Sequence, residues 1–555
     1  MAFIKNSNQQ INMEDATFGL TIREKKMLSQ SWADAFSKYI FPNINEERFS
    51  VLYSDNRASR PNTPVNVIIG SLILKELFNN TDEENMNSLM FDLRYKYALH
   101  TTSCENQPIS DRTPSRFREK LYWYEVETGR DLMKEEMEAL AGEFTKMLNL
   151  NPTMKRMDSL MVASSSKNMT RMEVFYAGVR DLVKAVNATG EAGLLEGRLL
   201  KYLEPSDQNN TIYRTASEGA ASKLEDILVD AIKLIEIASE TYKDLQEYKI
   251  LARIINDQSE KTQDGIKLRD KKKISSTSLQ NPSDEDATFR TKAGKNNKGY
   301  VANVVETFNG DVSIITGMEY ELNTHSDVEF CKTVIEGEPV YEDPIPMLTD
   351  GAYGSEETIA LAKAKNIILI TTSLIGKSPD PLLAEFEIDE VNHVIISCPA
   401  GEKPSDSTYI TKTDCYSSHF DKSVCMKCPN QNNCGVVMQK KSAIIRITSN
   451  KIKRSRYLKV MSQDQYKKFA NMRNAVEAIP SLMRRKYRVD EMPVRGYVRS
   501  KCWFFLKVGA INVKRMLAYA SFNAFCTFLY KLFYHFQFSR CNVQIYSKTR
   551  GFTSA

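Results

Sequence analysis

Three acidic residues in three different local contexts constrain the fold of this chain most strongly. Asp158 lies in a short apolar stretch of strand type, MKRMDSLMVAS. Asp350 follows the apolar run IPML and precedes Gly351, which is typical of a strand end that opens into a loop. Glu477 lies in the helical segment MRNAVEAIPSLMRRKYR. Three converging carboxylates can hold two divalent ions about 4 Å apart, as two-metal nucleases do, and Mg²⁺ prefers oxygen ligands. The order strand, strand end and helix therefore predicts an α/β core that brings these residues together.

Basic residues flank the glutamate on its predicted helix. Arg473, Glu477 and Arg484 fall at i, i+4 and i+11, which at 3.6 residues per turn lie within roughly 40° of one another. We expect Arg473 and Arg484 to contact phosphate near the scissile bond or to orient Glu477, and Arg485 and Lys486 to contact DNA. The alternative is a surface ion-pair network.

Several motifs occur together in an order that is more specific than any one of them. They are DSLMVASSSK at 158–167, NKGYVANVVE at 297–306, ELNTHSD at 321–327, LTDGAYGS at 348–355, RNAVEAIPSLMRRKY at 473–487 and GAINVKRML at 509–517. With these motifs the chain resembles bacterial insertion-sequence transposases of the DDE type, in the insertion-sequence family eleven-eighty-two. The stretch FPNINEERFSVLYSDNRASRPNTPVNVIIGSLILKELFNNTDEE resembles the InsH-type N-terminal domain of the same proteins.

This resemblance implies a fold and an activity. The expected fold is an RNase H-like mixed-sheet core, in which Asp158, Asp350 and Glu477 hold two Mg²⁺ ions that Mn²⁺ can replace. The expected activity is metal-dependent nicking at the ends of a mobile element, followed by transfer of the 3′-hydroxyl ends into target DNA. The expected partners are double-stranded DNA, as terminal inverted repeats and as target, and a second copy of the chain. Asn323 matches a family segment and is expected to line the DNA groove.

Two departures from the family pattern lie close to Glu477. Relatives often carry a Tyr where this chain has Ala470. Pro480 cannot donate to the carbonyl of Val476, so the helix should kink or restart there. A catalytically inactive DNA-binding remnant or repressor of transposition is therefore the alternative function.

The distribution of charge also indicates a nucleic-acid partner. The net charge of +5 is modest for 555 residues. Between Lys440 and Arg515, however, 21 Lys or Arg residues stand against only four acidic ones. Aromatic residues are interleaved with them, as expected for a surface that follows a phosphate backbone.

Cysteines cluster in one short region. Ten cysteines in 555 residues are too few for a disulfide scaffold, and clustered cysteines in a cytoplasmic protein are more often metal ligands. Four thiolates are expected to bind one structural Zn²⁺: Cys398, Cys425, Cys428 and Cys434. The residues alone leave Cys398, Cys415 and, less favourably, His419 open as the fourth ligand, and the resemblance favours Cys398. An all-thiolate site leaves no open position for a substrate, so this zinc would stabilise a subdomain.

Periodicity and composition divide the chain into segments. They are a helical N-terminal domain at 1–150, a first part of the core at 151–375 with a helical insertion at about 172–255 and a mobile polar linker at 256–298, a Cys-rich subdomain at 376–455, a second part of the core at 456–520, and an apolar helix and tail at 521–555. Within the first domain, DRTPSRFREKL places Arg112, Arg116 and Arg118 near a Pro-initiated helix. That domain is expected to bind DNA, as a module of the helix-turn-helix kind does, or to serve in docking or dimerisation.

The first part of the core contains a predicted hairpin, VANVVETF and VSIITGMEY, joined at Asn309-Gly310-Asp311. NIILITTSL at 366–374 is the predicted strand after Asp350. For Asp284 and Asp286, in the sequence PSDEDA, a solvated loop is preferred over a functional role.

No segment has the pattern of a signal peptide or a clear membrane span. The most apolar stretch, Met516–Phe538, is interrupted by Asn523, Lys531 and His535 and is interpreted as a buried helix. The expected location is the bacterial cytoplasm, in association with the nucleoid.

Overall fold

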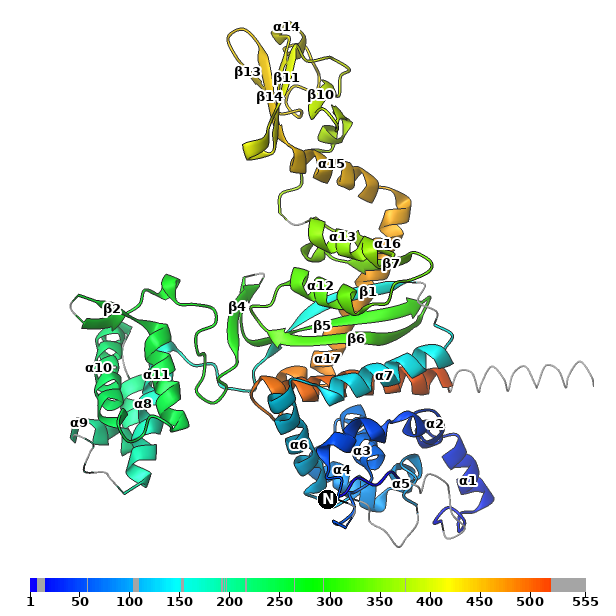
Figure 1. The fold of residues 1–555 in the computed structure, drawn as a ribbon, viewed down its shortest axis with the longest axis vertical. Helices are drawn as coiled ribbons and strands as arrows, with labels where there is room; N and C mark the ends of the chain where they lie inside the picture. Colours follow the sequence, from blue (N-terminus) through cyan, green and yellow to red (C-terminus); the bar gives the residue numbers. More distant parts are fainter. Residues whose placement is uncertain are drawn as a thin grey trace, which may run out of the picture. The chain divides into compact units, whose positions relative to one another are not determined.

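The computed structural model describes residues 1–520, apart from 7–14, 57, 103–108, 151–153, 191–192, 194, 196, 215–216, 264, 293 and 375. These residues form two compact units (Figure 1). Unit 1 comprises Met1–Asn151, Ser159–His325 and Pro480–Ala555, and unit 2 comprises Pro152–Asp158 and Ser326–Ile479. Unit 1 thus contains the predicted N-terminal domain together with the helix over residues 497–520.

The N-terminal region of unit 1 is helical, as predicted. Its elements are α1 (Ile22–Ser29), α2 (Trp32–Tyr39), η1 (Phe41–Asn43), η2 (Glu46–Leu52), α3 (Val65–Phe78), α4 (Asp82–Phe91), α5 (Leu93–Ala98), α6 (Thr113–Thr128) and α7 (Leu132–Met147). Helix α3 is buried along nearly its whole length because its sequence, VNVIIGSLILKELF, is mostly apolar and its few polar residues are not confined to one exposed face. The predicted Pro-initiated helix is α6, which has Pro114 in its first turn and ends at Gly129 in the left-handed conformation.

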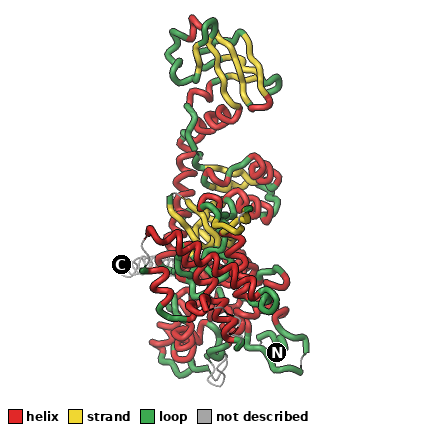
Figure 2. The backbone as a smooth tube through the Cα atoms, turned by 90° about the vertical axis from the view of Figure 1, so that its left-hand side faces the viewer, coloured by secondary structure: helices red, strands yellow, loops and turns green. Residues whose placement is uncertain are grey.

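The core contains a six-stranded mixed sheet (Figure 2). Its strands are β1 (Lys155–Ala163), β4 (Thr288–Lys292), β5 (Lys295–Asn309), β6 (Val312–Leu322), β7 (Ile345–Thr349) and β8 (Ile367–Thr371). The strand order is β4-β5-β1-β7-β8, with β6 beside β5. In unit 1, β5 pairs antiparallel with β4 and β6, and the predicted hairpin closes where Gly310 has φ +57°. In unit 2, β7 runs parallel to β1 and β8, which confirms the mixed sheet.

Strand β5 passes very close to the end of β1 at Gly299. This glycine has φ +141°, and a Cβ placed on it would lie 2.4 Å from the carbonyl oxygen of Val162 and 2.5 Å from the amide nitrogen of Ser164. That backbone approach leaves no room for a side chain, and the conformation is one that other residues rarely adopt.

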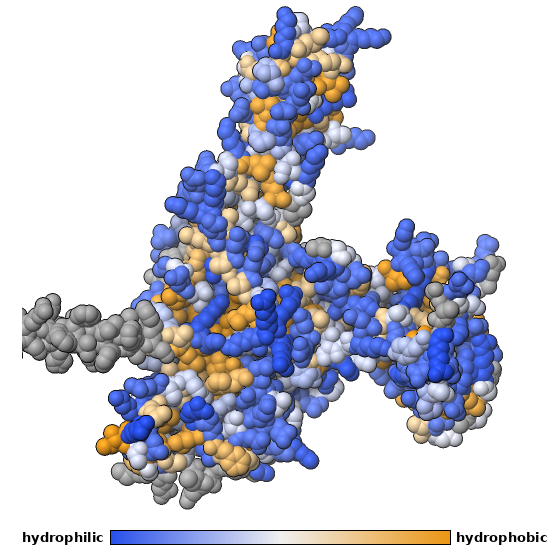
Figure 3. All heavy atoms as spheres, turned by 180° about the vertical axis from the view of Figure 1, so that it is seen from behind, coloured by the Kyte–Doolittle hydropathy of each residue, from blue (hydrophilic) through white to orange (hydrophobic). Residues whose placement is uncertain are grey.

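The predicted helical insertion is present in unit 1. It contains α8 (Arg171–Ala188), α9 (Gly197–Leu200), η4 (Lys201–Leu203), a π-helical turn (Asn209–Tyr213), η6 (Ser217–Gly219), α10 (Ala220–Ala238) and α11 (Gln246–Gln258). Apolar residues of α8, α10 and α11 form its core, including Phe175, Leu228 and Leu251. The outer surface of the insertion is mostly hydrophilic on the face shown at the right of Figure 3.

The prediction of a mobile linker at 256–298 is wrong. After the end of α11, this segment forms the hairpin β2 (Ser259–Thr262) and β3 (Gly265–Leu268), the turn η7 (Lys271–Lys273), β4 and the start of β5. Polar contacts accompany the burial of Leu279 in this segment. Asn281 donates to the carbonyl of Lys167, and Asp257 accepts from the amide of Leu279.

The preferred reading of Asp284 and Asp286 as a solvated loop is also wrong for Asp284, which is 2% exposed. Its carboxylate accepts from the hydroxyl of Tyr300 at 2.6 Å and from the amide of Gly496 at 3.2 Å. Asp286 accepts from the amide of Tyr497 at 2.8 Å. Both carboxylates thus hold the start of the helix over residues 497–520, where they also satisfy free amides of its first turn.

Besides the strands β7 and β8, unit 2 contains helices and the strands of the Cys-rich subdomain. Its elements are α12 (Asp327–Gly337), η8 (Gly351–Tyr353), α13 (Glu356–Ala364), η9 (Pro381–Glu385), β9 (Glu387–Asp389), β10 (Val394–Ser397), β11 (Asp406–Ile410), η10 (Thr411–Thr413), β12 (Cys415–Phe420), α14 (Lys422–Cys425), β13 (Val436–Met438) and β14 (Ala443–Thr448). Strands β11, β12, β14 and β13 form an antiparallel sheet in that order.

A series of helices leads from this subdomain to the end of the described chain. They are α15 (Ser449–Met461), α16 (Asp464–Asn474), η11 (Ala475–Glu477), α17 (Ala478–Arg485), η12 (Val489–Glu491) and the helix over residues 497–520. Within unit 2, Tyr457 of α15 donates to the carbonyl of Thr371 at 2.6 Å, which ties this helix to the end of β8. No helix of the described part is long and apolar enough to cross a membrane. Most of the predicted apolar stretch Met516–Phe538, and the tail at 521–555, lie outside the described residues.

Candidate active site

Strand register brings Asp158 and Asp350 to the same level. The paired residues Lys155 with Met347 and Arg156 with Leu348 are 192 positions apart in sequence, the same separation as Asp158 and Asp350. Neighbouring strands lie about 4.8 Å apart. Extended by two residues, this register puts Asp158 level with Asp350, the residue that follows β7.

Asp350 is held by the turn that follows its strand. It is the first residue after β7 and caps η8, with its Oδ1 accepting from the amide of Ala352 at 2.7 Å. The amide of Gly351 donates to Ser373 Oγ at 2.9 Å, which fixes the same turn to the segment after β8. The predicted strand-end position of Asp350 is confirmed.

Arg473 connects Asp158 with Glu477. Its Nη2 lies 3.2 Å from Asp158 Oδ1, and its Nη1 lies 2.6 Å from Glu477 Oε1. The Arg473 and Asp158 side chains are 11% and 14% exposed, whereas the Glu477 side chain is 56% exposed. One largely buried guanidinium thus bridges a strand carboxylate and a helix carboxylate.

A second arginine fastens the same helix to the sheet. Arg156 on β1 donates from Nη1 to the carbonyl of Met472 at 2.7 Å, one residue before Arg473. Strand residues 156 and 158 therefore both contact the end of α16. The motifs of the sequence did not indicate the role of Arg156.

The path of the chain around Glu477 is interrupted, as Pro480 predicted. Helix α16 ends at Asn474, Glu477 lies in the 3₁₀ turn η11, and α17 restarts at Ala478. Arg473, Glu477 and Arg484 therefore do not lie on one continuous α-helix, which the predicted common face assumed.

Arg484 makes its contacts within unit 1. It donates to the carbonyl of Met161 at 2.8 Å and lies 3.2 Å from Asp490. Arg485 is exposed. Burial, together with the nearby ammonium group of Lys514, lowers the pKa of Lys486 to about 8. Two neighbouring cations of this kind suit an anionic partner.

The predicted position of Asn323 at a DNA groove is wrong. This residue is fully buried, and its Nδ2 donates to the carbonyls of Thr288 at 3.2 Å and Asn297 at 3.3 Å. The side chain is used to satisfy backbone carbonyls of β4 and β5, so it does not reach the surface.

The four cysteines predicted as zinc ligands line one small cavity of about 20 Å³ in unit 2. Burial raises the pKa of the Cys425 and Cys434 thiols, and the neighbouring thiols raise them further. Cys398 is among the lining residues, whereas Cys415 pairs with Thr448 in the sheet and does not line the cavity.

As placed, no group of three or more His, Cys, Asp or Glu side chains within the described residues is arranged to hold a metal ion. The donor types nevertheless suit two different ions. Carboxylate oxygens at the sheet edge suit Mg²⁺, and clustered thiolates suit Zn²⁺.

Two segments of the chain match known families. Residues 397–517 match the family described as Transposase DDE domain, and residues 25–120 match the family described as Transposase domain (DUF772). The chain carries transposase domains. The DDE match contains Arg473 and Glu477 and implies an RNase H-like core, and Asp158 and Asp350 lie outside both matches. No curated protein and no solved structure matches the chain.

Proposed function

We propose that this protein is a DNA transposase that nicks DNA at the ends of its own mobile element and transfers the 3′-hydroxyl ends into target DNA. Asp158, Asp350 and Glu477 are the proposed catalytic residues. The observation that carries the proposal is the guanidinium of Arg473, which contacts both Asp158 on β1 and Glu477 in η11. The register of β1 and β7 supports the pairing of Asp158 with Asp350. The contacts of Arg473 support the pairing of Asp158 with Glu477. Assignment to the insertion-sequence family eleven-eighty-two, and action as a homodimer on DNA, are parts of the same proposal.

The three carboxylates would together hold two Mg²⁺ ions, which Mn²⁺ can replace. When bound, such ions activate the attacking oxygen and stabilise the leaving oxygen. The protein supplies the positioning: β1 and the turn after β7 fix two aspartates on ordered backbone, and Arg473 offsets the repulsion between Asp158 and Glu477. A cation bound by these carboxylates would compete with the guanidinium for the same oxygens.

The direct test is nicking of DNA that carries the ends of the element, with Mg²⁺ or Mn²⁺ present. Asp158→Asn, Asp350→Asn and Glu477→Gln preserve shape and remove charge, and each is expected to abolish nicking while DNA binding is retained. Asp490→Asn, which removes a carboxylate that contacts Arg484 and not Arg473, is the matched control. Wild-type cleavage by any of the three variants would remove that residue from the proposed site.

We also propose that Cys398, Cys425, Cys428 and Cys434 bind one structural Zn²⁺. Their common cavity supports this set over one with Cys415. Closing a tetrahedral shell requires the thiols to turn toward a common centre and lose their protons.

The alternative function is DNA binding without catalysis, as a repressor or remnant. It is motivated by Ala470 and by the position of Glu477 in a 3₁₀ turn with its carboxylate paired to Arg473. Excision of a marked element from a plasmid separates the two proposals, because only a transposase restores the donor site or releases the element.

A further inference from the structure

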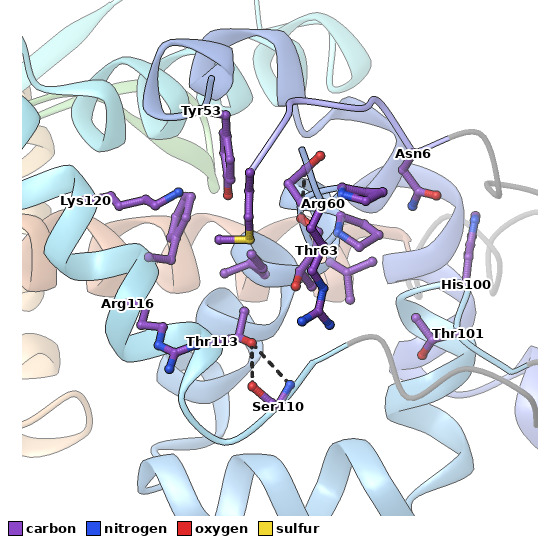
Figure 4. Close-up of a pocket in the computed structure, with 17 residues that line it drawn as sticks. Asn6, Tyr53, Arg60, Thr63, His100, Thr101, Ser110, Thr113, Arg116 and Lys120 are labelled. Carbon is purple, nitrogen blue, oxygen red and sulfur yellow. Dashed lines mark hydrogen bonds between the residues drawn. The ribbon is translucent and has the colours of Figure 1, made fainter. Parts of the chain in front are cut away.

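The N-terminal helical region of unit 1 contains a hollow of about 540 Å³, shown in Figure 4. It is lined by residues of α6, by the segment before α3 and the start of α3, by the N-terminal residues Met1 and Asn6, and by residues between α5 and α6. Three of the lining residues are cationic: Arg60, Arg116 and Lys120. None of the described lining residues is Asp or Glu. Three cations without a carboxylate among the described lining residues favour an anionic ligand.

The cations stand on facing walls. Arg116 and Lys120 lie four residues apart on α6 and therefore on one face of that helix. Figure 4 shows both on one side of the hollow, with Arg60 and Thr63 from the segment before α3 on the other. An anionic chain lying in the hollow would meet positive charge from two directions.

Within the described residues, the three cations of the hollow have no carboxylate partner. Across the described part of the chain, no salt bridge of Arg60, Arg116 or Lys120 with a carboxylate is present, and the two arginines are exposed. Arg118 on the same helix provides a contrast, because its guanidinium lies 2.6 Å from Asp82 and 4.5 Å from the centre of the Trp503 ring. Of the arginines predicted from the α6 sequence, Arg118 is thus used structurally and Arg116 is available to a ligand.

Lys120 is positioned rather than freely mobile. Its ammonium group donates to the carbonyl of Leu52 at 3.2 Å and stands 3.9 Å from the centre of the Tyr53 ring. Burial lowers the pKa of Lys120 because it disfavours the charged ammonium group. An anion in the hollow would stabilise that charge.

The remaining polar groups suit phosphate oxygens. The first turn of α6 borders the hollow, with Thr113 and Ser110 hydrogen-bonded to each other through their hydroxyls at 2.9 Å. The start of a 16-residue helix adds partial positive charge to that of the three side chains. Hydroxyl and amide donors beside Lys and Arg are typical of contacts to a nucleic-acid backbone.

We propose that this hollow binds the phosphodiester backbone of DNA, with Arg60, Arg116 and Lys120 as phosphate contacts. The inference rests on the proposed function in that it takes DNA as the partner, and it assigns a DNA contact to unit 1, whereas the proposed catalytic residues belong to unit 2. Binding of DNA in the hollow requires neither a metal ion nor cleavage of the DNA.

The test is binding of the full-length protein to a short mixed-sequence DNA duplex, measured by fluorescence anisotropy in EDTA over a series of salt concentrations. Arg60→Gln/Arg116→Gln removes two exposed cations of the hollow, and Arg23→Gln/Lys26→Gln on α1 is the matched control with the same change of charge. The hollow double variant is expected to lower the log–log salt slope by about 2 and to bind more weakly, whereas the control changes the slope by less than about 1. The variant Arg60→Lys/Arg116→Lys preserves both positive charges, so it should bind DNA nearly as tightly as the wild type.

Equal loss of affinity in the two glutamine variants would overturn the proposal, since binding would then follow net charge alone. Unchanged affinity in the hollow variant would overturn it as well. Thermal melting of each variant checks that the fold is intact, and Lys120→Met gives a third, independent substitution.

The binding site proposed in the hollow and the proposed catalytic function can fail independently of each other. If the hollow variants lose binding but no nicking is ever observed, the hollow stands and the catalytic proposal fails. If nicking depends on Asp158 while the hollow variants bind normally, the catalytic proposal stands and DNA binds elsewhere.

Discussion

The ammonium group of Lys507 lies 2.6 Å from the carboxylate of Glu76, and each of the two side chains is only 5% exposed. The pair joins α3 to the helix over residues 497–520 inside unit 1. Burial lowers the pKa of Lys507, and the Glu76 carboxylate acts in the opposite direction. The ends of the chain that unit 1 combines are thus linked by a buried charge pair as well as by apolar packing.

We expect Lys507→Met to destabilise unit 1 by about 3 kcal/mol, because it leaves the buried Glu76 carboxylate with only Lys75 at 3.5 Å. The double variant Lys507→Met/Glu76→Leu should recover most of this loss. The three tryptophans of the chain, Trp32, Trp123 and Trp503, all lie in unit 1, so tryptophan fluorescence during urea unfolding reports this unit. A double variant as unstable as the single one would show that the pair itself is not the cause.

Arg473→Gln should separate metal binding from turnover. Without the guanidinium, Asp158 and Glu477 lose their shared cation, so we expect the Mg²⁺ concentration for half-maximal nicking to fall. The maximal rate should drop by about tenfold or more because the two carboxylates are no longer held together. Arg473→Lys should resemble the glutamine variant in rate, since an ammonium group cannot span both carboxylates as a guanidinium does. A higher Mg²⁺ requirement in Arg473→Gln would contradict competition between the two cations.

The stability of unit 1 should depend on pH through Glu138 on α7. Burial raises the pKa of Glu138 from 4.5 to about 7, with a smaller contribution from the Glu319 carboxylate. A carboxyl group with a raised pKa binds its proton more tightly in the folded state, so its favourable contribution is present below pH 4.5 and is lost as the pH rises to about 7. Glu138→Gln should therefore raise the melting temperature at pH 8 much more than at pH 5.

The control for this prediction is Glu143→Gln on the same helix, whose carboxylate pairs with Lys146 at the surface. It should change the melting temperature little at either pH. An equal gain for Glu138→Gln at both pH values would show that ionisation of this group does not limit stability.

Cys428→Ser should abolish zinc binding, and Cys415→Ser should not. The first residue lines the common thiol cavity, whereas the second lies in β12 outside it. Elemental analysis is expected to give one zinc per chain for the wild type and for Cys415→Ser. Limited proteolysis should cut the Cys428→Ser variant between residues 376 and 455, because metal binding supplies folding free energy. A zinc-free wild-type protein that resists cleavage there would refute the site.

The strands around the two aspartates were predictable because local apolar runs bounded by turn residues determine them. The strand preceding Asp350 and the hairpin at Gly310 appear in the structure where their sequences indicate. The helix interruption at η11, just before Pro480, followed from the amide that this proline lacks. Each of these features depends on residues that are close in sequence.

The errors share a different cause, which is long-range polar contact. Asn323, Asp284 and the segment 256–298 all looked solvated because they are polar, yet each satisfies backbone groups that are far away in sequence. The bridge from Arg473 to Asp158 could not be foreseen either, because it depends on how the end of α16 lies against β1. A polar residue carries no periodic signal that separates these roles from exposure to solvent.

The close passage of β5 at Gly299 has a genetic consequence. Because even a methyl group would overlap the backbone at Val162 and Ser164, every missense change at codon 299 should yield a misassembled protein. Such an allele would lose DNA binding and cleavage together. A charge-neutral change at Asp158 would lose cleavage alone, so the two alleles form a pair that distinguishes loss of folding from loss of chemistry in a living cell.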